Sequence, residues 1–230
     1  MSSAIETTSS TTSGPAPTES GWHLRDVRSV FREFARSPTR TASVLPSSPF
    51  LVEPMTAPVP GRGDPVVVEL GAGTGVFTAA IQRRLAGRGR HIALELNERW
   101  AELLESRYPG AEVLCADANE LPRILIERGL AADVVVSSLP WEAHAEVGGT
   151  ALVDKIAGTL TGDGALTQLA HSCTQWASPA RRLKNQMRAA FEETLASRTV
   201  WRNFPPALVR VARRPRQPLS LVPDPSEVRN

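Results

Sequence analysis

Residues 65–75 read PVVVELGAGTG, a β-branched run that passes directly into three glycines separated by single residues. Such a run is typical of a strand that is buried on both faces of a parallel sheet. The glycines let the backbone come close to a ligand, and the helix predicted over 76–86 presents an electropositive N-terminus to it. The stretch therefore predicts a strand, a ligand-binding loop and a helix in direct succession.

Strand and helix patterns keep alternating downstream of this stretch. Further strands are predicted at 91–96, 111–116, 132–138 and 164–171, with helices at 98–107, 120–128 and 147–159. A long basic helix over 180–196 and a strand pair over 198–202 and 207–214 follow. Strands separated by helices of this length form βαβ units. The sequence predicts an α/β, Rossmann-like fold with a seven-stranded, mostly parallel sheet and helices on both faces.

The two ends of the chain differ in composition from the rest. Residues 1–20 contain eleven Ser or Thr, and 215–230 are rich in Pro. Segments with so little to bury cannot offset the entropy cost of ordering. We expect a disordered leader at 1–20, a single domain over 21–214 with a helical arm at 22–60, and a flexible tail at 215–230.

Composition excludes several classes of protein. No apolar stretch reaches the roughly 18–20 residues of a membrane span, and no secretory signal is visible at the N-terminus. Two cysteines are too few for a disulfide framework or a cysteine-built zinc site. A net charge of +2 is too small to indicate a nucleic-acid-binding protein. We expect a cytoplasmic protein with no metal site.

Acidic residues stand at the ends of three successive predicted strands. Glu69 lies two residues before the first glycine. Glu95 comes 26 residues after Glu69, and Asp117 comes after the third strand. The glycine spacing is G-x-G-x-G, and Val76 breaks the dinucleotide fingerprint G-x-G-x-x-G. An acid at the end of the second strand is suited to hold two ribose hydroxyls. A single acid at such a place also serves as a helix cap, and this alternative stays open.

Together these motifs resemble the class I S-adenosylmethionine-dependent methyltransferases. The resemblance implies that the glycine loop passes under the methionine and ribose of that cofactor, that Glu69 helps hold the methionine amino group, and that Glu95 grips the ribose. Asp117 and Ala118 would border the adenine. The cofactor-binding residues that we predict are Glu69, Gly71, Ala72, Gly73, Gly75, Glu95, Leu96, Asp117, Ala118 and Ser137.

Ser138-Leu139-Pro140-Trp141 ends the fourth predicted strand and resembles the [Asp/Asn/Ser]-x-Pro-aromatic signature of amino-directed methyltransferases. The proline stiffens the turn, so that backbone carbonyls can accept the protons of the target nitrogen. The tryptophan ring can lie against the nitrogen as it becomes cationic, a contact worth about 0.5–2 kcal/mol. We predict these four residues as the catalytic set; simple packing at the strand exit is the alternative.

Three segments, over 31–55, 67–81 and 200–214, resemble bacterial phospholipid N-methyltransferases and their relatives, and more distantly the rRNA adenine dimethyltransferases. The resemblance implies methylation of an amine such as that of phosphatidylethanolamine. A small-molecule, specialised-metabolite methyltransferase is the alternative. RNA methylation is disfavoured because those enzymes have a further helical domain after the sheet, and a cofactor-binding protein without activity is disfavoured by the intact Ser-Leu-Pro-Trp. The oligomeric state stays open.

The predicted helix at 22–36 carries an apolar arc beside an arc of four arginines. Such a helix suits either a peripheral contact with the inner face of a membrane or packing on the sheet. Glu142, His144 and His171 are candidate bases for the acceptor ammonium. The predicted helix over 180–196 carries four basic residues, which either bind a phosphate or form a solvated face. They are Arg181, Arg182, Lys184 and Arg188.

Overall fold

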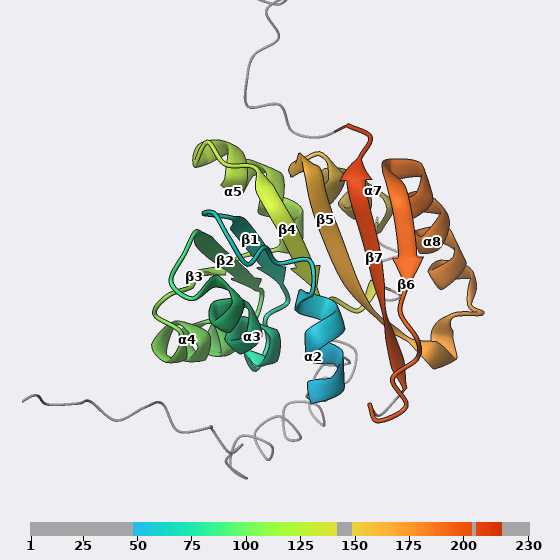
Figure 1. The fold of residues 1–230 in the computed structure, drawn as a ribbon, viewed down its shortest axis with the longest axis horizontal. Helices are drawn as coiled ribbons and strands as arrows, with labels where there is room; N and C mark the ends of the chain where they lie inside the picture. Colours follow the sequence, from blue (N-terminus) through green and yellow to red (C-terminus); the bar gives the residue numbers. More distant parts are fainter. Residues whose placement is uncertain (1–47, 142–148, 204–205, 218–230) are drawn as a thin grey trace, which may run out of the picture.

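The computed structural model describes residues 48–141, 149–203 and 206–217. In this part of the chain seven strands form one sheet in the order β3-β2-β1-β4-β5-β7-β6 (Figure 1). The strands are β1 (Val66–Leu70), β2 (Arg90–Glu95), β3 (Glu112–Cys115), β4 (Ala132–Ser137), β5 (Leu160–His171), β6 (Phe191–Ala196) and β7 (Ala207–Pro215). Only β7 runs antiparallel to its two neighbours. The predicted fold class is confirmed.

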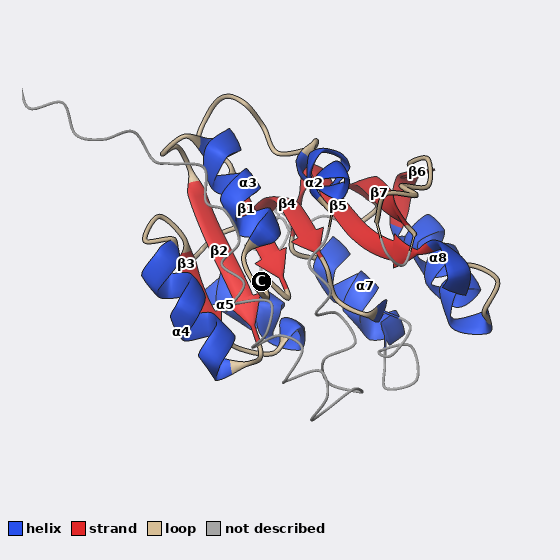
Figure 2. Cartoon of the chain, turned by 90° about the horizontal axis from the view of Figure 1, so that it is seen from below, coloured by secondary structure: helices blue, strands red, loops and turns tan. Residues whose placement is uncertain are grey.

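Helices lie on both faces of this sheet. Figure 2 shows α2 and α3 on one side and α5 and α7 on the other. The helices are α2 (Pro49–Thr56), α3 (Val76–Leu85), α4 (Glu98–Arg107), α5 (Leu121–Glu127), α7 (Gly149–Ala157) and α8 (Ser178–Ala190), with short 3-10 turns η1 (Ala118–Glu120) and η2 (Ser172–Thr174). In the described residues, no helix is both long enough and apolar enough to cross a membrane.

The apolar run of β1 fills two cores because its side chains alternate between the faces of the sheet. Val67 joins the cluster beneath α2 and α3. Val68 and Leu70 join the larger cluster beneath α5, α7 and α8. All three side chains are fully buried, which explains why this strand lacks the polar alternation of a half-exposed strand.

Helix α2 is fixed to the sheet by both apolar and polar contacts. Leu51 and Met55 are fully buried against it. The Thr167 hydroxyl of β5 donates to the Met55 carbonyl at 2.9 Å. Arg84 of α3 donates to the Thr56 hydroxyl at 3.0 Å. These bonds hold α2 against both the sheet and the neighbouring helix.

The order of the strands reverses beside β1, which pairs with β2 on one side and β4 on the other. Leu70 at its end pairs with Leu94 and with Ser137. The loops that leave β1 and β4 therefore emerge side by side at one edge of the sheet. In open α/β sheets, this reversal is where ligands bind.

The C-terminal third differs from the sequence prediction. The basic helix predicted over 180–196 ends at Ala190, and the next six residues form edge strand β6. The fully buried Phe191 pairs with Pro215, so tertiary pairing overrides the helical pattern. The strand predicted over 198–202 is wrong; Val200 makes only an isolated bridge to Ala207. Strand β7 also extends through Pro215, the first residue of the predicted tail.

Several predicted features lie outside the described residues. These are the leader at 1–20, the amphipathic helix at 22–36 and most of the tail at 215–230. Of the predicted arm at 22–60, the structure describes α2 and the turn that follows it.

Candidate active site at the switch point of the sheet

The loop after β1 depends on three glycines in the left-handed region, with φ of 72° at Gly71, 53° at Gly73 and 87° at Gly75. A Cβ on Gly71 would lie 2.9 Å from Leu139 Cδ2. A Cβ on Gly75 would lie 2.6 Å from Tyr108 Cε2. Backbone conformation and packing therefore both select glycine here. The result is a loop with little side-chain bulk at the edge of the sheet.

Glu95 at the end of β2 binds this loop directly. Its Oε2 accepts from the backbone N–H of Gly73 at 2.8 Å, and its Oε1 accepts from that of Asn97 at 2.9 Å. Burial raises the pKa of Glu95 above its ordinary value, although these two hydrogen bonds oppose the shift and the charge of Glu69 adds to it. A carboxylate oxygen has more than one acceptor site. Glu95 thus keeps capacity for further donors such as ribose hydroxyls.

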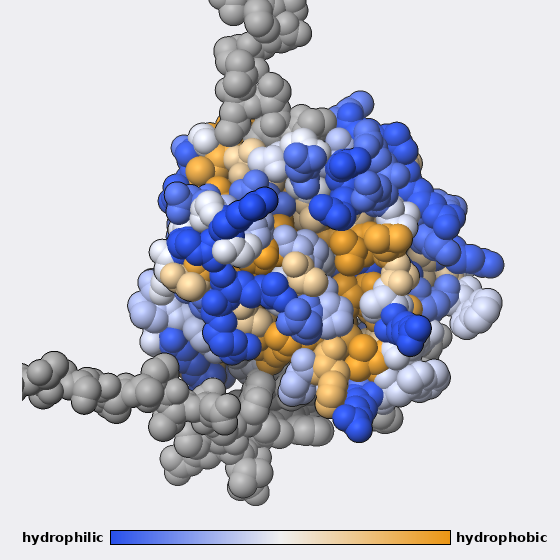
Figure 3. All heavy atoms as spheres, viewed as in Figure 1, coloured by the Kyte–Doolittle hydropathy of each residue, from blue (hydrophilic) through white to orange (hydrophobic). Residues whose placement is uncertain are grey.

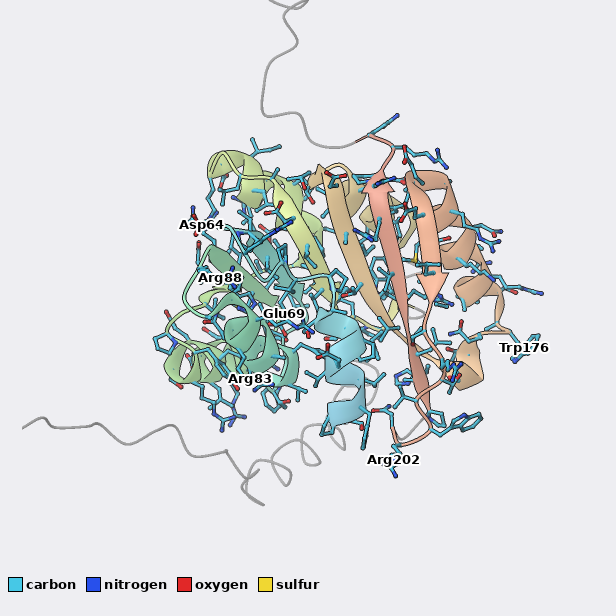
Figure 4. All side chains as sticks on the ribbon, in the orientation of Figure 1. Asp64, Glu69, Arg83, Arg88, Trp176 and Arg202 are labelled. Atoms are coloured by element: carbon cyan, nitrogen blue, oxygen red, sulfur yellow. The ribbon has the colours of Figure 1, made fainter. Side chains whose placement is uncertain are left out.

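Glu69 lies near the end of β1 (Figure 4), and its side chain is fully buried. Its Oε2 accepts from the Thr78 hydroxyl at 2.8 Å. The same oxygen lies 3.2 Å from His91 Nε2, an ion pair only when the ring is protonated and too poorly aligned for a hydrogen bond. Among the described residues, Glu69 Oε1 has no hydrogen-bond partner. A buried acceptor without a donor is costly and suits a cationic or N–H group of a ligand.

The orientation of His91 follows from Gln82. The Gln82 amide nitrogen donates to the Gly110 carbonyl at 3.1 Å and lies 2.9 Å from His91 Nδ1. Because an amide nitrogen only donates, this contact is a hydrogen bond in the tautomer in which His91 Nδ1 is the acceptor. Thr78, Gln82 and His91 were not predicted from the sequence. The signal available was a polar residue on an otherwise apolar helix face or strand.

Asp117 acts as a helix cap in this structure. Its Oδ1 accepts from the backbone N–H of Asn119 at 2.7 Å, and Glu120 completes a capping box with it. The contacts of Asp117 are therefore those of the alternative given above, a helix cap. Ala118 is the first residue of η1. Leu96 is exposed at the end of β2, where its carbonyl lies 3.8 Å from the Cys115 thiol.

Ser138 joins the loop after β4 to the glycine loop. Its hydroxyl donates to the Gly71 carbonyl at 2.5 Å, and its backbone N–H donates to the Leu70 carbonyl at 3.1 Å. The side chain of Leu139 packs beside Gly71. The segment predicted to hold the acceptor and the segment predicted to hold the cofactor are thus in direct contact.

The Trp141 ring is buried in the core, whereas the sequence led us to expect it beside the acceptor nitrogen. It is 2% exposed and belongs to the core beneath α5, α7 and α8. Its indole N–H donates to the Ser137 hydroxyl at 3.1 Å. This position corresponds to the alternative given above, packing at the strand exit. The Ser137 hydroxyl accepts the hydrogen bond from the indole. Pro140, between Leu139 and Trp141, is partly buried.

The remaining candidate groups are dispersed. Glu142 and His144 lie outside the described residues. His171 ends β5, and its ring Nδ1 is buried with no hydrogen-bond partner among the described residues. The four basic side chains of α8 are exposed: Arg181, Arg182, Lys184 and Arg188. In the part of the chain with described positions, no group of three His, Cys, Asp or Glu side chains is placed to hold a metal ion.

Comparison of sequences identifies one curated relative. It is the ornithine lipid N-methyltransferase of Singulisphaera acidiphila, which is 31% identical over 188 residues, covering 80% of this chain and 94% of the relative. No protein-family model matches the chain.

Solved structures share the fold at low sequence identity. An O-methyltransferase family protein from Burkholderia thailandensis has a TM-score of 0.58 at 16% identity, covering 83% of this chain and 63% of its own. A SAM-dependent O-methyltransferase from Thermotoga maritima has a TM-score of 0.54 at 15% identity, covering 72% and 65%. This chain thus spans just under two thirds of the length of both structures. Fibrillarin from Aeropyrum pernix, solved with bound S-adenosyl-L-methionine, has a TM-score of 0.54 at 14% identity, covering 71% and 73%.

The geometry of the site fits the cofactor that these proteins share. The glycine loop carries little side-chain bulk that would obstruct a ligand, and Glu95 offers unused acceptor sites at its rim. Glu69 Oε1, which has no hydrogen-bond partner among the described residues, would suit a cofactor that carries a sulfonium and an ammonium group. Sequence, fold and site agree, and the chain belongs to the family of S-adenosylmethionine-dependent methyltransferases that includes ornithine lipid N-methyltransferase.

Proposed function

We propose that this enzyme methylates the amine of a membrane lipid head group, with phosphatidylethanolamine and ornithine lipid as the acceptors to test first. The curated relative is named for an N-methyltransferase of ornithine lipid, which supports a lipid amine as the acceptor class. Ser138-Leu139-Pro140-Trp141 supports nitrogen as the target atom. We further propose that the protein works in the cytoplasm, at the inner face of the membrane.

The hydrogen bond from Ser138 to the Gly71 carbonyl carries this proposal. It joins residues 138–141, which we call the acceptor turn, to the loop proposed to hold the cofactor, and that cofactor supplies an activated methyl group on sulfonium. Glu69, Glu95 and the glycine loop would hold that cofactor, with Leu96, Ala118 and Asp117 at the adenine side. The turn after β4 would then hold the acceptor nitrogen. Most of the rate enhancement would come from this alignment.

The acceptor nitrogen needs hydrogen-bond acceptors, because it carries protons both before and after transfer. The Ser138 hydroxyl proton is directed at Gly71, so its oxygen is left to accept an N–H from the amine. The Leu139 carbonyl already accepts from the Trp141 backbone N–H at 2.9 Å and has one further acceptor site. These two oxygens would orient the amine, and a proton would leave to solvent or to a base.

Substitution Ser138→Ala tests this arrangement. We expect methyl transfer to a lipid amine to fall about tenfold, since one oriented hydrogen bond is lost, while cofactor affinity changes little. Ser106→Ala is the matched control, because Ser106 is exposed and, among the described residues, its hydroxyl donates to the Leu103 carbonyl of its own helix α4. Transfer is measured with radiolabelled cofactor on vesicles that contain phosphatidylethanolamine or ornithine lipid.

The same assay run on soluble amines and on rRNA tests the acceptor class. Label in the lipid fraction alone supports the proposal. Label in soluble amines and none in lipid would assign a small-molecule methyltransferase instead. Label in rRNA alone would contradict both.

A further inference from the structure

Three large aromatic side chains are exposed at one end of the molecule. Trp176 is 87% exposed, Trp201 is 78% exposed and Phe50 is 51% exposed. They come from the segment after η2, from the loop between β6 and β7, and from the start of α2. Trp176 projects away from the sheet in Figure 4. We refer to Phe50, Trp176 and Trp201 as the aromatic rim. Exposed side chains of this size mark sites of interaction when they gather.

Hydrogen bonds join the η2 segment to the loop between β6 and β7. The backbone N–H of Ser172 donates to the Pro206 carbonyl at 2.8 Å, and its hydroxyl donates to the Thr199 hydroxyl at 3.3 Å. Trp176 and Trp201 each lie a few residues from this junction. The two indole rings are therefore carried by loops that are fixed to each other.

The start of α2 is joined to the same loop. The backbone N–H of Ser48 donates to Asn203 Oδ1 at 2.9 Å. The Arg202 guanidinium lies over the Phe50 ring, 4.9 Å from its centroid. The three segments that carry the aromatic rim are thus joined to one another by hydrogen bonds.

This surface lies at the same edge of the sheet as the candidate active site. Ser137, which precedes the acceptor turn, pairs with Gln168 on β5. Strand β5 continues in the same direction to His171 and leads into η2 and Trp176. Figure 1 shows the end of β5, the start of β7 and the start of α2 at one end of the molecule.

Apolar and basic groups border the aromatic rim. Figure 3 shows apolar side chains gathered over β7 and continuing toward α2 at this end. Arg198 and Arg202 are exposed on the loop that carries Trp201. Arg181 and Arg182 are exposed near the start of α8, shortly after Trp176, and α8 contains no acidic residue. The surface therefore combines exposed indoles with positive charge.

We propose that the aromatic rim, with Arg181, Arg182, Arg198 and Arg202, docks on an anionic lipid surface. Tryptophan prefers the interface between head groups and hydrocarbon, where its ring is buried and its N–H stays hydrogen-bonded. Arginine near an anionic bilayer is attracted by the surface potential. Docking at this edge would present the active site to lipid head groups. The inference rests on the proposed function in taking the acceptor to be a membrane lipid.

Sedimentation of the full chain with vesicles tests the docking surface. The vesicles contain equal parts of phosphatidylglycerol and phosphatidylcholine, and are compared with vesicles of phosphatidylcholine alone. We expect Trp176→Ala with Trp201→Ala to weaken binding to the anionic vesicles about tenfold or more. Ile126→Ala is the matched control, because Ile126 is 62% exposed near the end of α5 that leads toward the start of β4.

One further variant completes the experiment. Arg181→Gln with Arg182→Gln should weaken binding to the anionic vesicles and leave binding to phosphatidylcholine unchanged. Unchanged binding by the double tryptophan variant would overturn the proposal, whether the remaining affinity comes from the predicted helix at 22–36 or from elsewhere.

Neither lipid in these vesicles offers an N–H to methylate, so docking is measured apart from methyl transfer. If the double tryptophan variant binds normally while the enzyme methylates lipid amines, the docking surface is wrong and the proposed function stands. If binding depends on the two tryptophans but no lipid amine is methylated, the docking surface stands and the proposed acceptor is wrong.

Discussion

At the residue scale, Trp141 combines a motif position with a core position. Its ring is 2% exposed and its N–H is bonded to Ser137, so truncation removes a large part of the core. We expect Trp141→Ala to lower the free energy of unfolding by about 3–5 kcal/mol. Trp141→Phe retains most of the buried ring and should cost less. Chemical denaturation measures both, with exposed Trp201→Ala as a control expected within about 0.5 kcal/mol of the parent. An equal loss in Trp201→Ala would contradict this assignment.

Glu95 gives the site a pH dependence of known sign. Burial raises the pKa of Glu95, so the folded state holds that proton more tightly than the unfolded state does. Its contribution to stability in the cofactor-free protein is therefore lost as pH rises from the ordinary pKa through the raised one. Cofactor affinity should change in the opposite direction, since the ionised carboxylate is the better acceptor for ribose hydroxyls.

We therefore expect cofactor affinity to fall on acidification, starting above the ordinary glutamate pKa of 4.5. Glu95→Gln should bind the cofactor more weakly and remove this pH step. Calorimetric titration of cofactor across the acidic range measures both effects. A pH step of the same size in Glu95→Gln would refute the assignment.

The acids at strand ends were predictable because strand and helix patterns fix where a strand stops. Their partners were not. Glu69 meets His91 through the register of β1 against β2, and Gln82 meets Gly110 across 28 residues of sequence. Such pairs depend on packing that a local pattern does not contain. The burial of Trp141 depends in the same way on packing with residues of α5, α7 and α8, which the local pattern at 138–141 does not contain.

At the element scale, the turn between α3 and β2 contains two glycines in similar backbone conformations but different surroundings. Gly87 has φ of 80° and open space where a Cβ would stand, whereas Gly89 has φ of 61° and a Cβ there would collide with the Pro65 carbonyl oxygen. Gly87→Ala should cost about 1 kcal/mol for the left-handed backbone alone. Gly89→Ala should cost about 2 kcal/mol more, because the backbone at Pro65 must move to make room for the Cβ. Urea unfolding measures the free energy of unfolding of the two variants. Equal losses would show that the backbone at Pro65 moves without cost and would contradict the prediction.

The boundary between α8 and β6 shows what element patterns leave undetermined. The charged residues of 180–196 favour a helix throughout, yet the chain turns at Phe191 to pair with β7. Burial of that one ring at the strand start and pairing with a distant partner outweigh local propensity. Val200 then closes the loop through its isolated bridge rather than forming a strand.

At the scale of the whole molecule, a mostly parallel sheet follows from the alternation of strands and helices, and this was predictable, whereas the order of the strands was not predicted. The reversal of order beside β1 brings the loops after β1 and β4 together, which places the two predicted motifs in contact. The aromatic rim was not predicted. Trp176, Trp201 and Phe50 are far apart in sequence, and only the return of β7 beside β5 brings their loops to one edge.

The hydrogen bond between Ser138 and the Gly71 carbonyl has a thermodynamic consequence. Any displacement of the Gly71 carbonyl when the cofactor binds also displaces the Ser138 hydroxyl, which would contact the acceptor lipid. Affinities for the two ligands are then coupled, and linkage requires the coupling to be reciprocal. An acceptor lipid should change the affinity for cofactor by the same factor by which the cofactor changes the affinity for lipid.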